Sequence, residues 1–389
     1  MQAIHFSSSF FYLGAVGLII ASSSTEAIAQ QIEFAKVDGS KTKLSLCGKL
    51  PSEIPKPSDE FPKTRNPWQQ PFHRCSIWNM PIGADASYVP ANFEAANHFG
   101  IDREYFYRLK DSDPLQAVLS PGSFGPGRCT GKQISMNLSL PIPNNLIVPD
   151  ATSYPYSTPN NAAAFLMPDG RTIEQLEPLA RCSAGGDIYG WRNPWGGVDI
   201  KGDGIKGTHF GSGLSAIGGS IRRGELTDEE PIRHAIKVLV WGKKYLHYSK
   251  SMPGYRFPAD RADRYAESEY KGTNSKLVQG SLLAIPPRIE MKSLQLKTFP
   301  AQKIFKALQN YGAYIVDDAY WDAHYLAVEQ GVSEEFRSRY GYALEGNSGD
   351  FYNDMMKIFQ VLHIVDNNRA DNIGGGGKLR QPLAPPFED

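Results

Sequence analysis

Short apolar segments separated by glycine and proline recur through the middle of the chain. Each is four to eight residues long, the length of a typical strand, and turn-forming residues bound each of them. Such spacing is typical of a β-sandwich or a barrel. The segments are Ile134–Leu138, Ala162–Met167, Val198–Lys201, Leu214–Ile221, His234–Trp241 and Ser281–Ile285.

Helical patterns lie mainly after residue 300. Ala301–Asn310 has the apolar spacing of a helix, and Glu334–Tyr340 and Phe351–His363 predict two more. A shorter helix is expected at Ala91–His98, and Tyr311–Asp317 predicts a buried strand that ends in an acid. The fold class expected is mainly β: one β-sandwich or jelly-roll domain over 68–365 with peripheral helices.

The two ends of the chain differ from this middle part. Phe10–Ala21 is too short to span a bilayer, and Ala27–Ala29 is typical of a signal-peptide cleavage site, so residues 1–29 predict a signal peptide. We therefore expect a secreted protein, extracellular or periplasmic, without membrane association after signal removal. Residues 30–67 predict an extended proline-rich segment. The Gly/Pro-rich tail, 366–389, predicts a mobile arm or a surface strap.

Charge and composition exclude two classes of protein. The 389 residues include 41 basic and 41 acidic side chains, so no net positive charge attracts nucleic acid. Hydrophobic residues are 41% and charged ones 21%, which excludes a disordered chain. The many glycines, prolines and aromatics favour a β-rich fold.

Four widely spaced cysteines indicate disulfides. Cys47, Cys75, Cys129 and Cys182 form no CxxC pair, which disfavours a zinc site. In an oxidising compartment they predict two disulfides, and three pairings remain open. No motif indicates a cofactor or a metal, so we expect neither.

Aromatic and acidic residues among glycines mark 187–225 as a candidate site. Trp191 and Trp195 predict either a sugar-stacking platform or core residues. Asp199 alternates with two β-branched neighbours, so it faces solvent or a cleft. His209 follows in the glycine-rich stretch and is a candidate substrate-binding residue.

A second candidate group comprises Arg222, Glu225 and His234. His234 lies on an apolar strand face and is either a core histidine or a group that orients a carboxylate. Residues 222–264 contain ten Lys/Arg and six Asp/Glu. This local excess of positive charge suits either an anionic sugar or a solvated surface. Arg261 in this stretch is a further candidate for substrate binding.

The carboxylates favour cleavage of glycosidic bonds in a polysaccharide. A glycosidase needs two carboxyl groups, and the candidates are Asp199, Glu225 and Asp317, with His234 as orienter. Asp317 and Asp318 are adjacent in a strand, so only one is expected to enter a given cleft. One alternative is a lyase that uses Arg222 with His209, His234 or Tyr314 as base. Another is a non-catalytic glycan-binding or cell-wall protein.

Several motifs resemble a large group of mostly uncharacterised secreted bacterial proteins, common in actinobacteria. The resemblance covers about residues 66–386 and implies secretion without implying an activity. Phe210 departs from the small residue that the group has after the histidine. The motifs are Trp78–Ile82 with Asp85, Ser212–Gly219 leading to Arg222 and Glu225, His234–Lys237, Phe257–Ala259 with Arg261 and Asp263, Ala307–Tyr314 ending at Asp317, and Asn372–Gly374.

Overall fold

The computed structural model describes residues 53–388, apart from 126, 131–133 and 152–159. All described residues belong to one compact unit. The predicted signal peptide, most of the proline-rich segment and Cys47 lie outside the described residues.

The protein is mainly β, as expected, but its strands form one mixed sheet of 13 strands. A sandwich or jelly-roll is not confirmed. The strands follow one another across the sheet as β1 (Tyr88–Pro90), β13 (His363–Val365), β10 (Leu282–Ala284), β11 (Ala313–Ala319), β9 (Ile236–Trp241), β12 (Ala323–Glu329), β2 (His98–Arg108), β5 (Ala163–Leu166), β6 (Thr172–Ala180), β7 (Ile188–Arg192), β3 (Leu115–Leu119) and β4 (Ser135–Pro141), and β8 (Val198–Asp199) pairs with β6.

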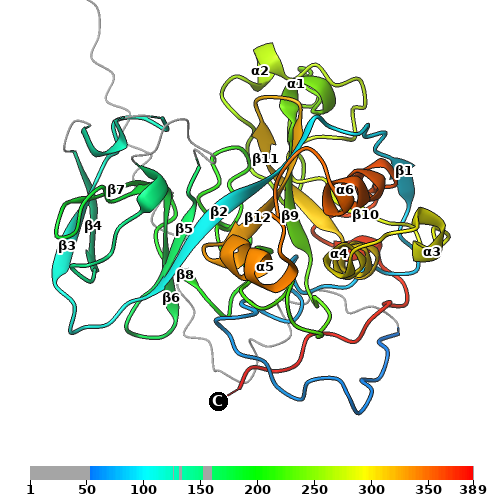
Figure 1. Cartoon of the computed structure of the whole chain (residues 1–389), viewed down its shortest axis with the longest axis horizontal. Coiled ribbons are helices and arrows are strands. Elements are labelled where there is room, and N and C mark those ends of the chain that lie inside the picture. Colours follow the sequence, from blue (N-terminus) through cyan, green and yellow to red (C-terminus); the bar gives the residue numbers. More distant parts are fainter. Residues whose placement is uncertain (1–52, 126, 131–133, 152–159, 389) are drawn as a thin grey trace, which may run out of the picture. The chain divides into compact units, whose positions relative to one another are not determined.

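The long strand β2 joins the two halves of this sheet (Figure 1). Its first part, His98–Glu104, pairs in parallel with β12, and its last part, Tyr105–Arg108, pairs with β5. The sheet is strongly curled. Five strand spacings separate β6 from β11, which is about 24 Å in a flat sheet. Yet side-chain atoms of Glu177 in β6 and Asp317 in β11 lie within 4.8 Å of each other.

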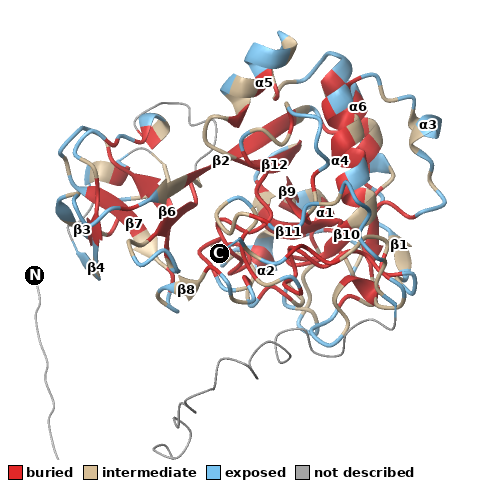
Figure 2. Ribbon diagram, turned by 90° about the horizontal axis from the view of Figure 1, so that it is seen from below, coloured by how far each residue is buried: buried red, intermediate tan, exposed pale blue. Residues whose placement is uncertain are grey.

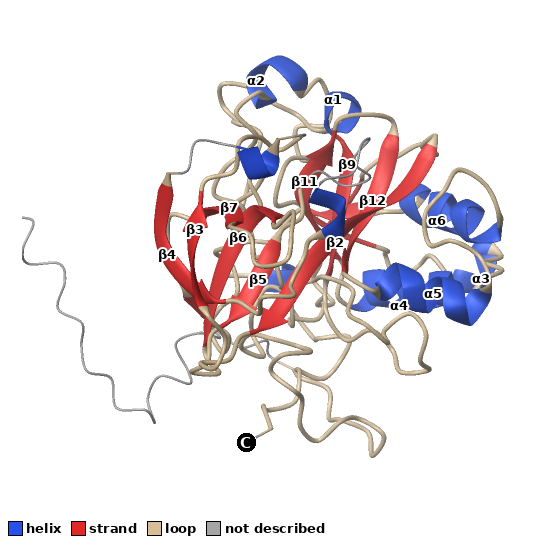
Figure 3. Ribbon diagram, turned by 60° about the vertical axis from the view of Figure 1, so that its left-hand side comes forward, coloured by secondary structure: helices blue, strands red, loops and turns tan. Residues whose placement is uncertain are grey.

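Helices cover one face of the half-sheet that contains β9, β11 and β12 (Figure 3). Phe305 of α4 and Phe359 of α6 belong to one buried cluster with Val238 of β9 and Ile315 of β11. In Figure 2 the strands and the inner sides of these helices are accordingly buried. The helices are α1 (Gly242–Tyr245), α2 (Ala266–Glu269), α3 (Met291–Leu294), α4 (Phe299–Asn310), α5 (Val332–Tyr340) and α6 (Asp350–Gln360), with 3-10 turns η1 (Arg128–Thr130), η2 (Pro149–Ala151) and η3 (Ile373–Gly375).

Most of the predicted elements are present, with shifted ends. The segments predicted from residues 162, 234, 281 and 311 become β5, β9, β10 and β11, and those predicted from 301, 334 and 351 become α4, α5 and α6. The segments predicted from 134 and 198 correspond in part to β4 and β8. Residue 363 of the third predicted helix starts β13 instead, because α6 ends at Gln360.

Two predicted elements are wrong. Ala91–His98 is an irregular segment rather than a helix, since Asn92 has a positive φ of 58° and the chain enters β2 at His98. Leu214–Ile221 is a buried loop, not a strand, because Gly218 and Gly219 turn the chain closely around the Trp78 ring.

The tail is a strap on the main body. Leu379 and Leu383 are buried in a cluster with Cys75 and Met80. One disulfide joins Cys129 to Cys182, and Cys75 is also disulfide-bonded, so none of the described cysteines is free. Among the described helices, none has the length and apolar character needed to cross a membrane.

Candidate functional site

A fully buried network of charged side chains connects Glu104 of β2 to Lys237 of β9, two strands that lie on either side of β12. Glu104 Oε1 accepts hydrogen bonds from Lys237 Nζ at 2.5 Å and pairs with His209 Nε2 at 2.8 Å. The other carboxylate oxygen accepts the hydroxyl of Ser220. All four residues are buried, so Glu104 is fully satisfied within the protein.

His209 links Glu104 to a second carboxylate. Its Nδ1 lies 3.6 Å from Glu177 Oε1, and the other oxygen of Glu177 accepts the backbone N–H of Phe210 at 2.7 Å. Burial and Lys237 lower the pKa of His209, but its contacts with Glu104 and Glu177 outweigh them and raise that pKa to about 9. His209 is therefore a cation between two carboxylates at neutral pH.

The buried acids outnumber the buried bases in this network. Burying unpaired charge is expensive, so the surplus carboxyl groups tend to keep their protons. Burial and neighbouring carboxylates raise the pKa of Asp102 to about 7 and that of Asp317 well above its ordinary value. The four acids are Asp102, Glu104, Glu177 and Asp317, and the two bases are His209 and Lys237.

Three aspartates form the outer part of the same cluster. Asp263, Asp317 and Asp318 each place a carboxylate oxygen within 4.8 Å of the other two. Both Asp317 and Asp318 thus reach one partner, contrary to the expectation from strand alternation.

The three aspartates differ in their hydrogen-bond donors. Asp263 accepts Tyr270 OH at 2.5 Å and Gln279 Nε2 at 3.4 Å. Asp317 accepts the amide of Asn160 at 3.2 Å and the backbone N–H of Asp318 at 2.9 Å.

These environments separate the pKa values of the acids. Burial raises the pKa of Asp263, but hydrogen bonds from Tyr270, Tyr265 and Gln279 oppose that shift. Burial raises the pKa of Asp317, and the nearby charges of Asp263 and Glu177 raise it further. Asp263 is thus the better anion of the two, and Asp317 the better holder of a proton.

The backbone at Gly211 lies close to the carboxylates of Asp317 and Asp263. A Cβ atom on Gly211 would lie 2.4 Å from Asp317 Oδ1 and 3.0 Å from Asp263 Oδ2. Only glycine leaves room for both carboxylates against that loop.

An aromatic group adjoins Glu177. Trp191 of β7 lies opposite Glu177 in the β6–β7 pair, and its ring centroid is 5.6 Å from that of Phe210 and 5.1 Å from that of Phe124. Phe210 thus extends an aromatic surface next to the acids. Trp191 and His209 therefore lie in the same cluster as Asp317, although His209 is fully buried between Glu104 and Glu177.

Three other predicted site residues lie in separate contacts. Asp199 forms a surface ion pair with Arg171 at 2.7 Å. Trp195 is 49% exposed and holds Lys206 Nζ 3.9 Å from its ring centroid. Arg261 pairs with Asp260 at 2.7 Å, beside Gly213.

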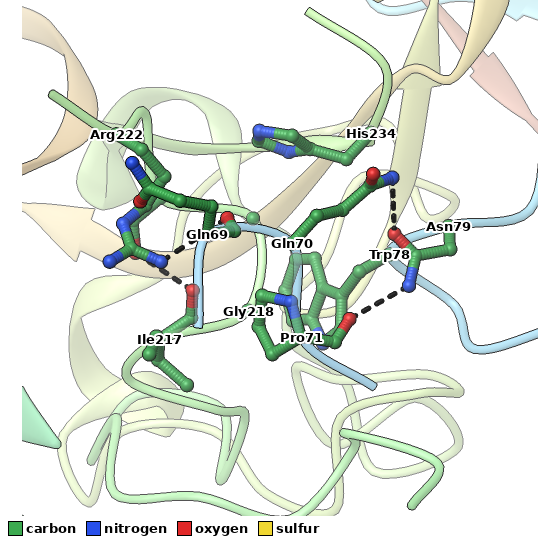
Figure 4. Close-up of a pocket in the computed structure, with 11 residues that line it drawn as sticks. Gln69, Gln70, Pro71, Trp78, Asn79, Ile217, Gly218, Arg222 and His234 are labelled. Atoms are coloured by element: carbon green, nitrogen blue, oxygen red, sulfur yellow. Dashed lines mark hydrogen bonds between the residues drawn. The ribbon is translucent and has the colours of Figure 1, made fainter. Parts of the chain in front are cut away.

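Glu225, His234 and Arg222 form a group of their own. Figure 4 shows Arg222 and His234 at the small cavity that they line. His234 Nε2 lies 3.0 Å from Glu225 Oε1, and burial of the pair is offset by their attraction, so the pKa of Glu225 is lowered and that of His234 raised. Arg222 is buried against Glu329 at 2.9 Å and the carbonyl of Trp68. The cavity beside them, about 10 Å³, has room for one water molecule.

A larger cavity of about 420 Å³ has no carboxylate and no histidine in its lining, which consists of two basic side chains, a tyrosine and apolar groups. The pair of carboxyl groups that cleavage of a glycosidic bond requires is therefore absent from this cavity, and we place the candidate site at the acid cluster. The lining residues are Pro55, Ala84, Tyr88, Pro287, Lys378, Leu379 and Arg380.

The acid cluster also contains side chains of the types that bind divalent cations. Three sets of side chains each have possible ligand atoms within 4.8 Å of one another, and two of these sets include His209. His209 Nε2 lies 3.2 Å from Lys237 Nζ. That ammonium competes with a metal ion for the same negative charge. Protonated carboxyl groups balance the remaining charge without an ion.

The chain matches no protein-family model, no curated protein and no solved structure at significant similarity. The function is therefore argued from the site alone. Sequence reasoning missed Glu104, Glu177, Lys237 and Asp263 as members of the cluster. A usable signal existed, because Lys237, Asp263 and Asp317 each belong to a sequence stretch singled out above, and the structure brings these stretches together.

Proposed function

We propose that the protein hydrolyses glycosidic bonds in a polysaccharide, with Asp317 as the proton donor and Asp263 as the second carboxylate. The observation that supports this most is the three-aspartate group, whose members lie within 4.8 Å but have unequal hydrogen-bond donors. A glycosidase requires such a pair, one carboxyl group protonated and the other ionised.

The mechanism follows from these environments. Asp317 gives its proton to the oxygen of the leaving sugar, while Asp263 in its carboxylate form bonds to the sugar carbon. Water then cleaves this glycosyl–enzyme bond, its hydroxyl goes to the sugar carbon and its proton returns to Asp317. Tyr270 keeps Asp263 in place through its 2.5 Å hydrogen bond. The short separation favours a retaining enzyme, in which the carboxyl groups are about 5 Å apart.

The lyase alternative has less support than the sequence suggested. A lyase that acts on a uronate needs a cation near the sugar carboxylate, and Arg222 is buried with Glu329 and a backbone carbonyl. His234 is likewise engaged by Glu225. Non-catalytic glycan binding is the remaining alternative, and it predicts adsorption without any change in chain length.

The test is a polysaccharide panel read in two ways from the same wells. New reducing ends without absorbance near 235 nm are expected, since hydrolysis leaves no unsaturated sugar. Asp317→Asn protein is the blank, and it should release none. Absorbance together with reducing ends would replace the hydrolase with a lyase, and silence over neutral, basic and acidic glycans would leave only binding.

A further inference from the structure

Exposed aromatic side chains follow the acid cluster directly in the chain. Tyr320 and Trp321 form the turn between β11 and β12, immediately after Asp317–Ala319, and are 80% and 49% exposed. Tyr265, which is 38% exposed, donates its hydroxyl to Asp318 Oδ1 at 2.8 Å. Large apolar rings so exposed are candidates for binding surfaces when they lie together beside a site.

Trp321 is held in place although it is exposed. Its indole Nε1 donates to Tyr325 OH at 2.8 Å, and one ring face stacks on His98 with centroids 5.1 Å apart and planes at 29°. A ring fixed in this way loses little conformational freedom when a ligand covers its free surface. Trp321 is therefore suited to act as a rigid stacking platform.

The platform lies close to the acids. Asp317 of β11 and Tyr325 of β12 both pair with Leu239 of β9, one on each side. Two strand spacings, about 10 Å, separate their backbones, and Tyr325 is the residue that anchors Trp321. Trp321 therefore lies on the Asp317 side of the acid cluster, whereas the Trp191–Phe210 surface adjoins Glu177 within the same cluster.

The charges around these acids are predominantly negative. In the described part of the chain no lysine or arginine forms an ion pair with Asp263, Asp317 or Asp318, and Arg261 is paired with Asp260. The two buried cations of the cluster are engaged by Glu104. A uronate carboxylate placed here would lose water, would find no cation to pair with and would be repelled by the ionised carboxyl groups, which opposes its binding.

We propose that the acid cluster and the Trp321 platform form one binding surface for a glycan chain without acidic groups, a neutral or amino-sugar polymer, and that uronate polymers are rejected. This inference rests on the proposed function and names its substrate class. It also predicts that sugars beyond the cleaved bond contribute affinity, because the platform lies about two strands away from Asp317.

The test is affinity gel electrophoresis of Asp317→Asn protein, which binds without degrading the glycan. The gels contain β-glucan, xylan, galactomannan, glycol chitosan, polygalacturonate or alginate. Retardation is expected in at least one neutral or amino-sugar gel and in neither uronate gel. Adding Trp321→Ala should weaken the apparent affinity about tenfold. Tyr342→Ala, which removes an exposed tyrosine next to α5, is the control and should migrate like its parent.

Equal or stronger retardation in a uronate gel, or no retardation in any gel, overturns the inference. A third contradicting outcome is a loss of apparent affinity in Trp195→Ala without a loss in Trp321→Ala. The proposed function fails separately. If wild-type protein is retarded through Trp321 but releases no reducing ends from the glycan that it binds, the binding surface stands and the hydrolase does not.

Discussion

At the scale of single residues, the cluster is explained by a shortage of buried cations. Lys237 and His209 can neutralise two carboxylates, and both are committed to Glu104 and Glu177. Asp102 and Asp317 have no such partner, and burial raises the pKa of each. The fold therefore favours protonated carboxyl groups at these two positions, and such a group is the acid that the proposed chemistry needs.

Stability should fall as pH rises because of Asp102. Its folded-state pKa, about 7, lies above the ordinary carboxyl value, so its contribution is fully present near pH 4 and is lost as pH approaches 7. Asp102→Asn removes a dependence of up to about 4 kcal/mol over that window. Urea unfolding at several pH values measures it. Asp199→Asn, which alters a surface ion pair, is the control, and an unchanged slope in Asp102→Asn contradicts the assignment.

The loop glycine at 211 should be intolerant of a side chain. Gly211→Ala forces a methyl group against Asp317 Oδ1, 2.4 Å from the ideal Cβ position, so the loop or the carboxylate must move. We expect a loss of about 1–3 kcal/mol in the free energy of unfolding and a large loss of any activity. Gly125→Ala has open space around the new methyl group and should behave like the wild type.

At the scale of elements, β2 is the strand that organises the site. It pairs with β12 through its first part and with β5 through its last, and its buried Asp102 and Glu104 lie at the change of partner. The half-sheet beyond β5 has its own buried cluster, which includes Val118, Leu140 and Leu176. The disulfide between Cys129 and Cys182 fastens η1 to the end of β6 in that half.

Removing this disulfide should destabilise the protein without altering the acid cluster. The cross-link closes a loop with a sequence separation of 53 residues, for which chain entropy predicts about 4 kcal/mol. The double variant Cys129→Ser with Cys182→Ser should lose about 2–4 kcal/mol in denaturant unfolding while the wild-type pH dependence persists. A loss below about 1 kcal/mol would show that the unfolded chain is already constrained there.

At the scale of the whole molecule, sequence patterns predicted some of the elements and little of their assembly. Helix α4 was identifiable because its apolar positions follow the helical period, and strand β11 because it begins with a continuous apolar run. Strand β2 was missed because Asp102 and Glu104 occupy buried positions that a pattern search expects to be apolar. Charged residues at buried positions also concealed the site. Glu177 and Lys237 look like surface residues in the sequence, because only the curled sheet brings β6 and β9 together.

The candidate residues show the same limit. Asp317, His209 and Trp191 were found from local features and do meet in the cluster. Asp199 and Glu225 were equally plausible locally, but each has a partner of its own, Arg171 and His234, which no periodicity reveals. Which carboxylates converge depends on contacts between strands far apart in sequence. The spacing of apolar and polar residues along one sequence does not show these contacts.

The most direct measurement compares hydrolysis rates of three variants on the glycan that the wild-type protein cleaves. Asp317→Asn should lower kcat by about 10²–10⁴-fold, the usual contribution of a general acid. Asp199→Asn and Glu225→Gln should stay near the wild-type rate, with folding checked by circular dichroism for all three. Near wild-type turnover in Asp317→Asn, or a comparable loss in Asp199→Asn, would contradict the assignment of the acid cluster as the catalytic centre.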